Sequence, residues 1–114
     1  MKGGLESIRV AVRVRPYMKQ ELGRGNVIFI DPNNETKIKV GKDNNYYEGI
    51  YDKIFGFYSK QLEIFEFVKP LIYDVLEGIN CTVLSYGQTG SGKTFTMFGA
   101  DWTYNEKYFK NFNL

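Results

Sequence analysis

The sequence contains no histidine and one cysteine among its 114 residues. Without histidine, neither a Ser-His-Asp triad nor histidine acid–base chemistry can be assembled, and with a single cysteine the usual zinc sites are excluded as well. A lone cysteine forms no internal disulfide, so we expect a reducing compartment. We interpret Cys81 itself as a small core residue rather than a reactive thiol.

Charge of one sign and long apolar runs are also scarce. The formal net charge is +2, which is too small to predict a nucleic-acid or membrane-surface partner. No apolar run approaches the ~20 residues that cross a bilayer, and no signal-peptide pattern opens the chain. Hydrophobic residues make up 43% of the sequence, as in globular proteins, so we expect one modest domain with no membrane contact.

Short alternating or β-branched stretches predict strands in the first half of the chain. Apolar and other residues alternate over residues 8–15, which predicts a strand with one buried face. The polar, glycine-containing segment 17–26 is interpreted as a loop. Residues 27–30 and 36–40 flank a turn-forming segment and predict a hairpin, and residues 41–45 predict a second turn. The aromatic stretch 46–55 is expected to be extended, and Asp52 within it is interpreted as a hydrogen-bonding residue at a strand end.

One helix is predicted in the middle of the chain. Ser59 is a favourable N-cap, and Gly78 is placed to end the helix. Between them, apolar residues recur at helical spacing and predict a face that packs into the core. Pro70 lies inside this span, so we expect a kink or a local break there.

The densest chemical signal is a glycine-rich stretch that follows the pattern G-x-x-x-x-G-K-[ST]. An apolar run of strand length precedes it at residues 82–86, and residues 95–97 can continue as a helix. The stretch consists of Gly87, Gln88, Thr89, Gly90, Ser91, Gly92, Lys93 and Thr94.

These residue types suit a phosphate chain. Glycines let backbone N–H groups curl around phosphate oxygens that a Cβ would keep away. Lys93 supplies a full charge near the β- and γ-phosphates, and Thr94 offers a hydroxyl to Mg²⁺. The motif and its context predict nucleotide binding; the alternative is a glycine-rich turn that matches the pattern by chance.

Four stretches together resemble the kinesin motor domain. The stretch 78–97 (GINCTVLSYGQTGSGKTFTM) is the most specific of them, and the others occur at residues 8–16 (IRVAVRVRP), 51–56 (YDKIFG) and 59–65 (SKQLEIF). The resemblance runs from about residue 8 to residue 99. It implies an α/β fold, the three-layer P-loop NTPase fold of the kinesin motor type, present only as an amino-terminal fragment.

The resemblance also implies site residues and ligands. ATP and Mg²⁺ are the implied cofactors, with Thr94 at the metal. Arg13, Arg15 and Pro16 are expected beside the adenine, and Phe95 is expected to pack on the base. Without the resemblance, the arginines would be ordinary strand-edge charges and Phe95 a core residue. No residue matches a general base, so no catalytic residue is assigned.

The resemblance covers only part of a motor. Such domains are about three times as long, and the switch segments, among them D-x-x-G-x-E, have no counterpart here; phosphoryl transfer depends on those parts as well. We therefore expect residues 1–7 to be a flexible start, 8–99 to match the family and 100–114 to begin the variable loop that follows the P-loop.

The whole motor would hydrolyse ATP to move along, or remodel, microtubules. Its partner would be tubulin in the cytoplasm and cytoskeleton, and it would oligomerise through regions outside this sequence. Residues 80–82 (NCT) leave the spindle kinesins open as a subfamily. Two alternatives stand: an inactive fragment that binds nucleotide weakly, or another P-loop ATPase.

The resemblance finally implies a gap in the sheet. In kinesins the first strand and the strand before the P-loop are separated by a strand from near the end of the domain. This sequence lacks that strand, so segments 8–15 and 82–85 would lie about 9–10 Å apart without a partner between them. We expect the chain alone to be marginally folded.

Overall fold

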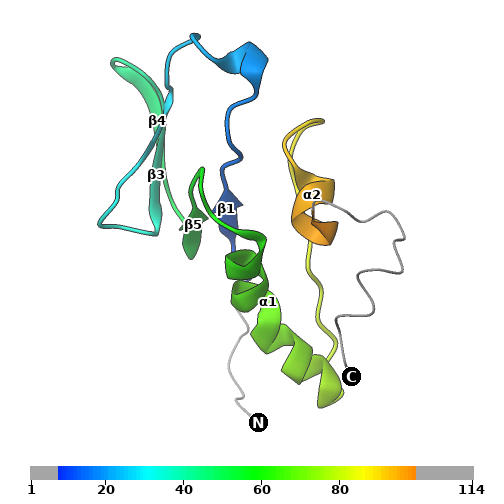
Figure 1. Cartoon of the computed structure of the whole chain (residues 1–114). Helices are drawn as coiled ribbons and strands as arrows, with labels where there is room; N and C mark the ends of the chain where they lie inside the picture. Colours follow the sequence, from blue (N-terminus) through cyan, green and yellow to red (C-terminus); the bar gives the residue numbers. More distant parts are fainter. Residues whose placement is uncertain (1–7, 100–114) are drawn as a thin grey trace. The chain divides into compact units, whose positions relative to one another are not determined.

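The computed structural model describes residues 8–99 and divides into two compact units, Met1–Ser59 and Lys60–Leu114 (Figure 1). Within residues 8–99, the first unit holds five short strands and one turn of 3-10 helix, and the second holds two α-helices. This mixture of helix and strand agrees with the α/β class expected. The predicted flexible start at 1–7 and the predicted loop at 100–114 lie outside the described residues.

A two-stranded parallel sheet in the first unit joins β1 (Ala11–Arg13) to β5 (Lys53–Phe55). The strand predicted over 8–15 is thus confirmed in its centre but is shorter, because it pairs only where β5 lies beside it. Asp52 has the predicted role: its Oδ2 accepts a hydrogen bond from the Val10 amide at 2.7 Å.

An antiparallel sheet of three strands forms the rest of the first unit. It consists of β2 (Ile28–Ile30), β3 (Lys37–Lys42) and β4 (Asn45–Ile50), in that order across the sheet. The predicted hairpin is confirmed, and the extended segment 46–55 is divided between β4 and β5. The second turn is tighter than the 41–45 stretch suggests, because β3 and β4 continue to Lys42 and Asn45.

The core of the first unit is small. Val14, Ile38 and Ile54 are buried against one another. Val14 directly follows β1, whereas Ile38 lies in β3 and Ile54 lies in β5, so this cluster holds the two sheets together. Partly buried side chains surround it, namely Val12, Ile28, Ile30, Tyr51 and Phe57.

The segment 17–26, predicted as loop, contains one turn of 3-10 helix, η1 (Lys19–Glu21). The loop prediction is wrong at these three residues. The carboxylate of Glu21 accepts a hydrogen bond from the Met18 amide at 2.8 Å, and the Glu21 amide donates to the Met18 carbonyl at 2.9 Å. These two bonds close the turn, because they satisfy groups at its amino end.

In the second unit, α1 (Gln61–Leu76) confirms the predicted helix. Its N-cap is Lys60 and not Ser59, so that prediction is wrong by one residue. The Ser59 amide donates to the Gly56 carbonyl in the preceding turn. The Glu63 carboxylate accepts from the Lys60 amide at 2.5 Å and so satisfies the helix start.

The carboxyl end of α1 follows the prediction. Gly78 has φ of +89°, its amide donates to the Val75 carbonyl, and the Ile79 amide donates to the Asp74 carbonyl. This is a Schellman ending, which favours glycine at the left-handed position. The helix is continuous through Pro70, so the predicted local break is wrong.

The apolar face of α1 packs less than expected. Ile64 is its single buried residue, whereas Leu62 and Leu76 are 66% and 78% exposed. The prediction of a core face is thus confirmed at Ile64, whereas Leu62 and Leu76 do not belong to the core of residues 8–99. No helix in residues 8–99 is long and apolar enough to span a membrane.

After α1 the chain returns to α2 (Lys93–Phe98) as an irregular segment (Figure 1). The predicted strand at 82–85 is absent: these residues join neither sheet of the described part. Val83 and Leu84 are 45% and 83% exposed. A strand is stabilised by its neighbours, and no described strand pairs with this one.

Candidate functional site

The glycine-rich stretch forms a loop between the irregular segment and α2, and the predicted helix after it is confirmed. Gly90 and Gly92 have φ of +82° and +101°, which side chains other than glycine rarely adopt. A Cβ placed on either would meet nothing within 4 Å. These glycines are therefore needed for backbone shape, and they leave open space beside the loop.

Gly87 is needed for a different reason, which is space. A Cβ at this position would lie 2.4 Å from Ser91 Oγ and 3.1 Å from Ser91 Cβ. The Ser91 amide donates to the Gln88 carbonyl at 3.1 Å, which holds the two arms of the loop together. The loop is thus closed on itself at its base, with Gly87 against Ser91.

Lys93 bends back over the loop from the first position of α2. Its Nζ donates to the carbonyl oxygens of Gly87 at 2.6 Å and Gln88 at 2.9 Å. Both acceptors are neutral, so these bonds position the ammonium group without neutralising its charge. A positive charge is therefore held at the loop, where the motif predicts phosphate binding.

The Ser91 hydroxyl is buried and has no hydrogen-bond partner among the described residues. Buried hydroxyls nearly always have a partner, so an orphaned one in this loop fits a site whose ligand supplies polar atoms. With the open space at Gly90 and Gly92 and the charge of Lys93, the loop fits a phosphate group. The sequence predicted Ser91 as a member of the phosphate-binding stretch, but it did not predict the orphaned hydroxyl.

The other residues predicted on this side lie in the same unit. Thr94 and Phe95 occupy the first turn of α2, where Thr94 is exposed and Phe95 is 46% exposed. Gln88 and Thr89 are exposed at the tip of the loop. Phe95 is therefore not a core residue of the described chain.

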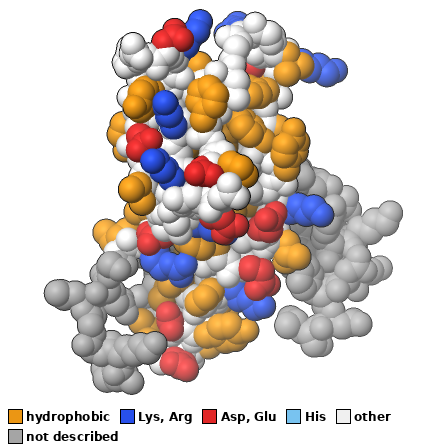
Figure 2. Space-filling view, turned by 90° about the vertical axis from the view of Figure 1, so that its left-hand side faces the viewer, with side chains coloured by type: hydrophobic (Ala, Val, Ile, Leu, Met, Phe, Trp, Pro, Cys, Tyr) orange, Lys and Arg blue, Asp and Glu red, His pale blue; other side chains and the backbone are white. Residues whose placement is uncertain are grey.

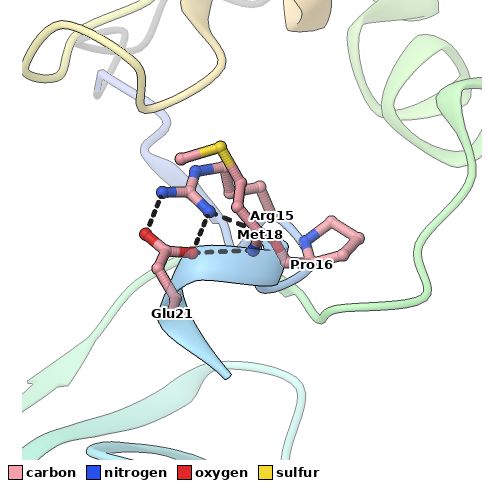
Figure 3. A network of polar contacts seen from close by, with 4 residues as sticks. All are labelled: Arg15, Pro16, Met18 and Glu21. Carbon is pink, nitrogen blue, oxygen red and sulfur yellow. Dashed lines mark hydrogen bonds and ion pairs between the residues drawn. The ribbon is translucent and has the colours of Figure 1, made fainter. Parts of the chain in front are cut away.

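Arg13, Arg15 and Pro16 lie in the first unit, at the end of β1 and just after it. Burial lowers the pKa of Arg13, which stays charged at neutral pH. Arg15 forms an ion pair with Glu21 in which two nitrogens meet two oxygens (Figure 3). Hydrogen bonds from Arg15 and from the Met18 amide lower the pKa of Glu21 to about 2.

Two residues that form hydrogen bonds near the predicted site residues, Glu21 and Gln61, were not predicted from the sequence. Glu21 stands three residues after Met18, which is the capping-box spacing, but methionine is not a capping residue and the signal is weak. Gln61 begins α1 and donates from Nε2 to the Thr96 carbonyl in α2 at 2.7 Å. Nothing in the sequence around Gln61 indicates this long-range contact.

Comparison with known proteins gives consistent matches. The family model for the kinesin motor domain matches residues 13–108. Kinesin-like protein KIN-14C of Oryza sativa subsp. japonica is 42% identical over 109 residues, covering 87% of this chain and 11% of the relative. Kinesin heavy chain of Syncephalastrum racemosum is 42% identical over 100 residues, covering 83% of this chain and 10% of the relative.

Solved structures agree. A structure of KIF14 with ADP in complex with a microtubule has a TM-score of 0.73 at 36% identity, covering 83% of this chain and 29% of that one. A structure of a fast kinesin has a TM-score of 0.70 at 34% identity, covering 78% of this chain and 25% of that one. The chain thus spans about a tenth of these curated relatives and between a quarter and a third of the solved motors.

Proposed function

Because this chain belongs to the kinesin motor domain family, we propose that it is the ATP-binding part of a motor that couples ATP hydrolysis to movement along, or remodelling of, microtubules. The observation that carries the proposal is the loop at 87–94, over which Lys93 holds its charge 2.6 Å from the Gly87 carbonyl. The resemblance to a structure of KIF14 with ADP and a microtubule supports the same ligand class and partner.

Within this proposal each loop residue has a role. The backbone of Gly87 to Gly92 surrounds the phosphates, the Ser91 hydroxyl finds a partner there, and Lys93 contributes its charge to the β- and γ-phosphates. Thr94 contributes its hydroxyl to Mg²⁺. The chemistry that a bound Mg²⁺ supplies is neutralisation of charge on the phosphate oxygens.

The base side of the proposal involves four residues, namely Arg13, Arg15, Pro16 and Phe95. A guanidinium plane and an aromatic ring are both suited to stacking on a purine. The exposed fraction of Phe95, 46%, leaves part of its ring accessible to a ligand. In the cell, the proposed location of the whole motor is the microtubule cytoskeleton.

Replacing Lys93 tests the phosphate site. Lys93→Ala removes the cation from the loop, and we expect the 114-residue chain to lose at least about tenfold, or ~1.4 kcal/mol, of its affinity for a fluorescent ATP analogue. The matched control is Lys69→Ala, which removes a lysine of the same unit that pairs with Glu66 on α1. Unchanged affinity in Lys93→Ala would show that the loop is not the binding site.

A second candidate function is favoured by one observation, namely that this chain covers less than a third of each solved motor structure. The switch II segment D-x-x-G-x-E does not occur in the sequence. The 114-residue chain by itself would then bind nucleotide weakly without hydrolysing it. Release of phosphate distinguishes this candidate from an active ATPase.

A further inference from the structure

We propose that β4 is the interface through which two copies of this chain associate, with their β4 strands antiparallel and Tyr47 of one copy opposite Tyr47 of the other. The inference concerns the antiparallel sheet of the first unit and does not depend on nucleotide binding. It rests on the hydrogen-bond directions in that sheet, on the side chains of β4 and on the charges beside them.

The backbone of β4 has an open edge. β4 is the last strand in the order β2-β3-β4, and no strand of residues 8–99 pairs with its other side (Figure 1). The Gly41 amide donates to the Val27 carbonyl on the β2 side, so it does not bond to Tyr46, which lies opposite it in β4. Hydrogen-bonded and non-bonded pairs alternate along an antiparallel ladder. The residues of β4 whose amides and carbonyls point away from β3 are therefore Tyr46, Glu48 and Ile50.

The other strand edges of the first unit are occupied or short. At the outer edge of β2, the Ile28 amide donates to Asn26 Oδ1 at 3.0 Å. On the side of β5 away from β1, the Ile54 amide donates to the Glu35 carbonyl at 2.6 Å. β1 and β2 each have three residues, whereas β4 has six. In the described part of the chain β4 is thus the longest open edge, and such an edge is a template for pairing with another chain.

The side chains of β4 select one register for a pair of identical strands. A two-fold axis makes such a pair self-complementary, and an axis at Tyr47 or at Glu48 pairs most of the strand. An axis at Glu48 places two carboxylates directly opposite each other, which is unfavourable, whereas an axis at Tyr47 places two aromatic rings opposite each other, which is favourable. Tyr47 is 61% exposed, so its ring is accessible to a second copy.

The charges beside the edge favour the same register. With the axis at Tyr47, Tyr46 of one copy exchanges backbone hydrogen bonds with Glu48 of the other. Lys39 Nζ lies 3.5 Å from the centroid of the Tyr46 ring, so the incoming carboxylate lies next to a cation. Within residues 8–99 no carboxylate forms an ion pair with Lys39, because Glu48 of the same chain pairs with Lys37. Each copy therefore offers a cation to the carboxylate of the other.

The first test places like charges on the two-fold axis. In Tyr47→Lys two lysines lie opposite each other in place of two rings, while the backbone bonds to β3 remain. We expect the dissociation constant of the dimer, measured by sedimentation equilibrium of the 114-residue chain, to rise at least about tenfold. The matched control is Tyr58→Lys, the same change at a residue of the same unit that is 93% exposed and lies outside the strands. Equal effects of the two substitutions, or a chain that is monomeric at every concentration, would overturn the proposal.

The second test checks the register by cross-linking in a Cys81→Ser background. Directly opposite residues of a non-hydrogen-bonded pair have Cα atoms about 4.5 Å apart, which is within the range of a disulfide. Tyr47→Cys should therefore form a cross-linked dimer rapidly under mild oxidation. Ile50→Cys, on the same strand and 77% exposed, is the control and should cross-link slowly, because its counterpart in the second copy is several residues away. Equal rates would overturn the register.

A measurement on the unsubstituted chain covers the case in which Tyr47→Lys does not fold. Hydrogen exchange of the Tyr46 and Glu48 amides, which point away from β3, should become slower as the protein concentration rises. The Ile30 amide, at the opposite edge of the same sheet, serves as the internal control and should show no such slowing. Exchange at Tyr46 and Glu48 that is independent of concentration, or slowing at Ile30 in their place, would overturn the proposal.

Discussion

At the scale of single residues, a role in binding the nucleotide base can be distinguished most clearly from a role in core packing at Phe95. Its ring is 46% exposed in the first turn of α2. If it packs on the base, Phe95→Ala in the 114-residue chain should weaken ATP binding by ~0.5–1.5 kcal/mol, the range for an aromatic contact. Tripolyphosphate binding should hardly change, because that ligand has no base.

The control for Phe95 is Phe98→Ala, three residues further along the same helix, where the ring is 67% exposed. It should affect neither ligand. Titration calorimetry with both ligands measures the difference, and equal losses for ATP and tripolyphosphate in Phe95→Ala would place this residue in a structural role.

Individual residues also show where sequence reasoning succeeds. Gly78 was placed correctly because its role is local and requires only a positive φ. The loop at 87–94 follows from its pattern for the same reason. Asp52 was correctly predicted to be a hydrogen-bonding residue at a strand end, but its donor, the Val10 amide 42 residues away, was not predicted. The Arg15–Glu21 pair and the Gln61–Thr96 bond escaped prediction because they depend on how segments of the chain meet.

At the scale of elements, the predictions hold where a partner is close in sequence. The hairpin of β2 and β3 and the helix α1 were expected and are present. The strand at 82–85 was expected and is absent, because a β-branched, apolar run forms a strand only with a neighbour beside it. The strand predicted over residues 8–15 is reduced to the three residues of β1 for the same reason, because these are the residues that pair with β5.

The hairpin between β3 and β4 depends on Gly41, which supports a prediction at this scale. Gly41 has φ of +142°, and a Cβ there would lie 2.4 Å from both the Asn45 carbonyl oxygen and Tyr46 Cα. Both atoms belong to the backbone, so no side-chain rotation relieves the clash. Gly41→Ala should destabilise the first unit by about 2–3 kcal/mol, measured as the folded fraction of amide signals in NMR spectra.

Gly56→Ala is the matched control for this substitution. The nearest atom to its Cβ would be Ile30 Cδ1 at 3.5 Å, which is an ordinary contact with a movable side-chain end. Its effect should stay within about 0.5 kcal/mol. A folded fraction in Gly41→Ala equal to that in Gly56→Ala would contradict the steric argument.

At the scale of the whole molecule, we expect the 114-residue chain to show no ATP hydrolysis. Phosphoryl transfer requires that the metal, the phosphates and the attacking water be positioned together, and the loop supplies only the phosphate part. A phosphate-release assay with and without microtubules should stay at the level of the Lys93→Ala variant. Microtubule-stimulated turnover by the purified chain would contradict this expectation.

The amount of buried apolar surface supports the last prediction. Five hydrophobic residues are buried in the described part of the chain, namely Val14, Ile38, Ile54, Phe55 and Ile64. By contrast, Leu84 is 83% exposed and Tyr86 is 96% exposed, and Figure 2 shows hydrophobic side chains spread over one face among charged ones. The conformational entropy lost on folding is offset mainly by the burial of apolar surface. A core of this size therefore leaves little net free energy of unfolding.

We therefore expect the purified chain to melt in a broad transition and to self-associate as its concentration rises. A two-stranded sheet such as β1–β5 is marginal alone, and strand edges and apolar surface both favour pairing with further chains. Calorimetry should show no sharp heat-absorption peak, and sedimentation should show larger species that dissociate on dilution. A sharp, cooperative melt of a monomer would contradict the prediction, because it would require a core larger than these five residues provide.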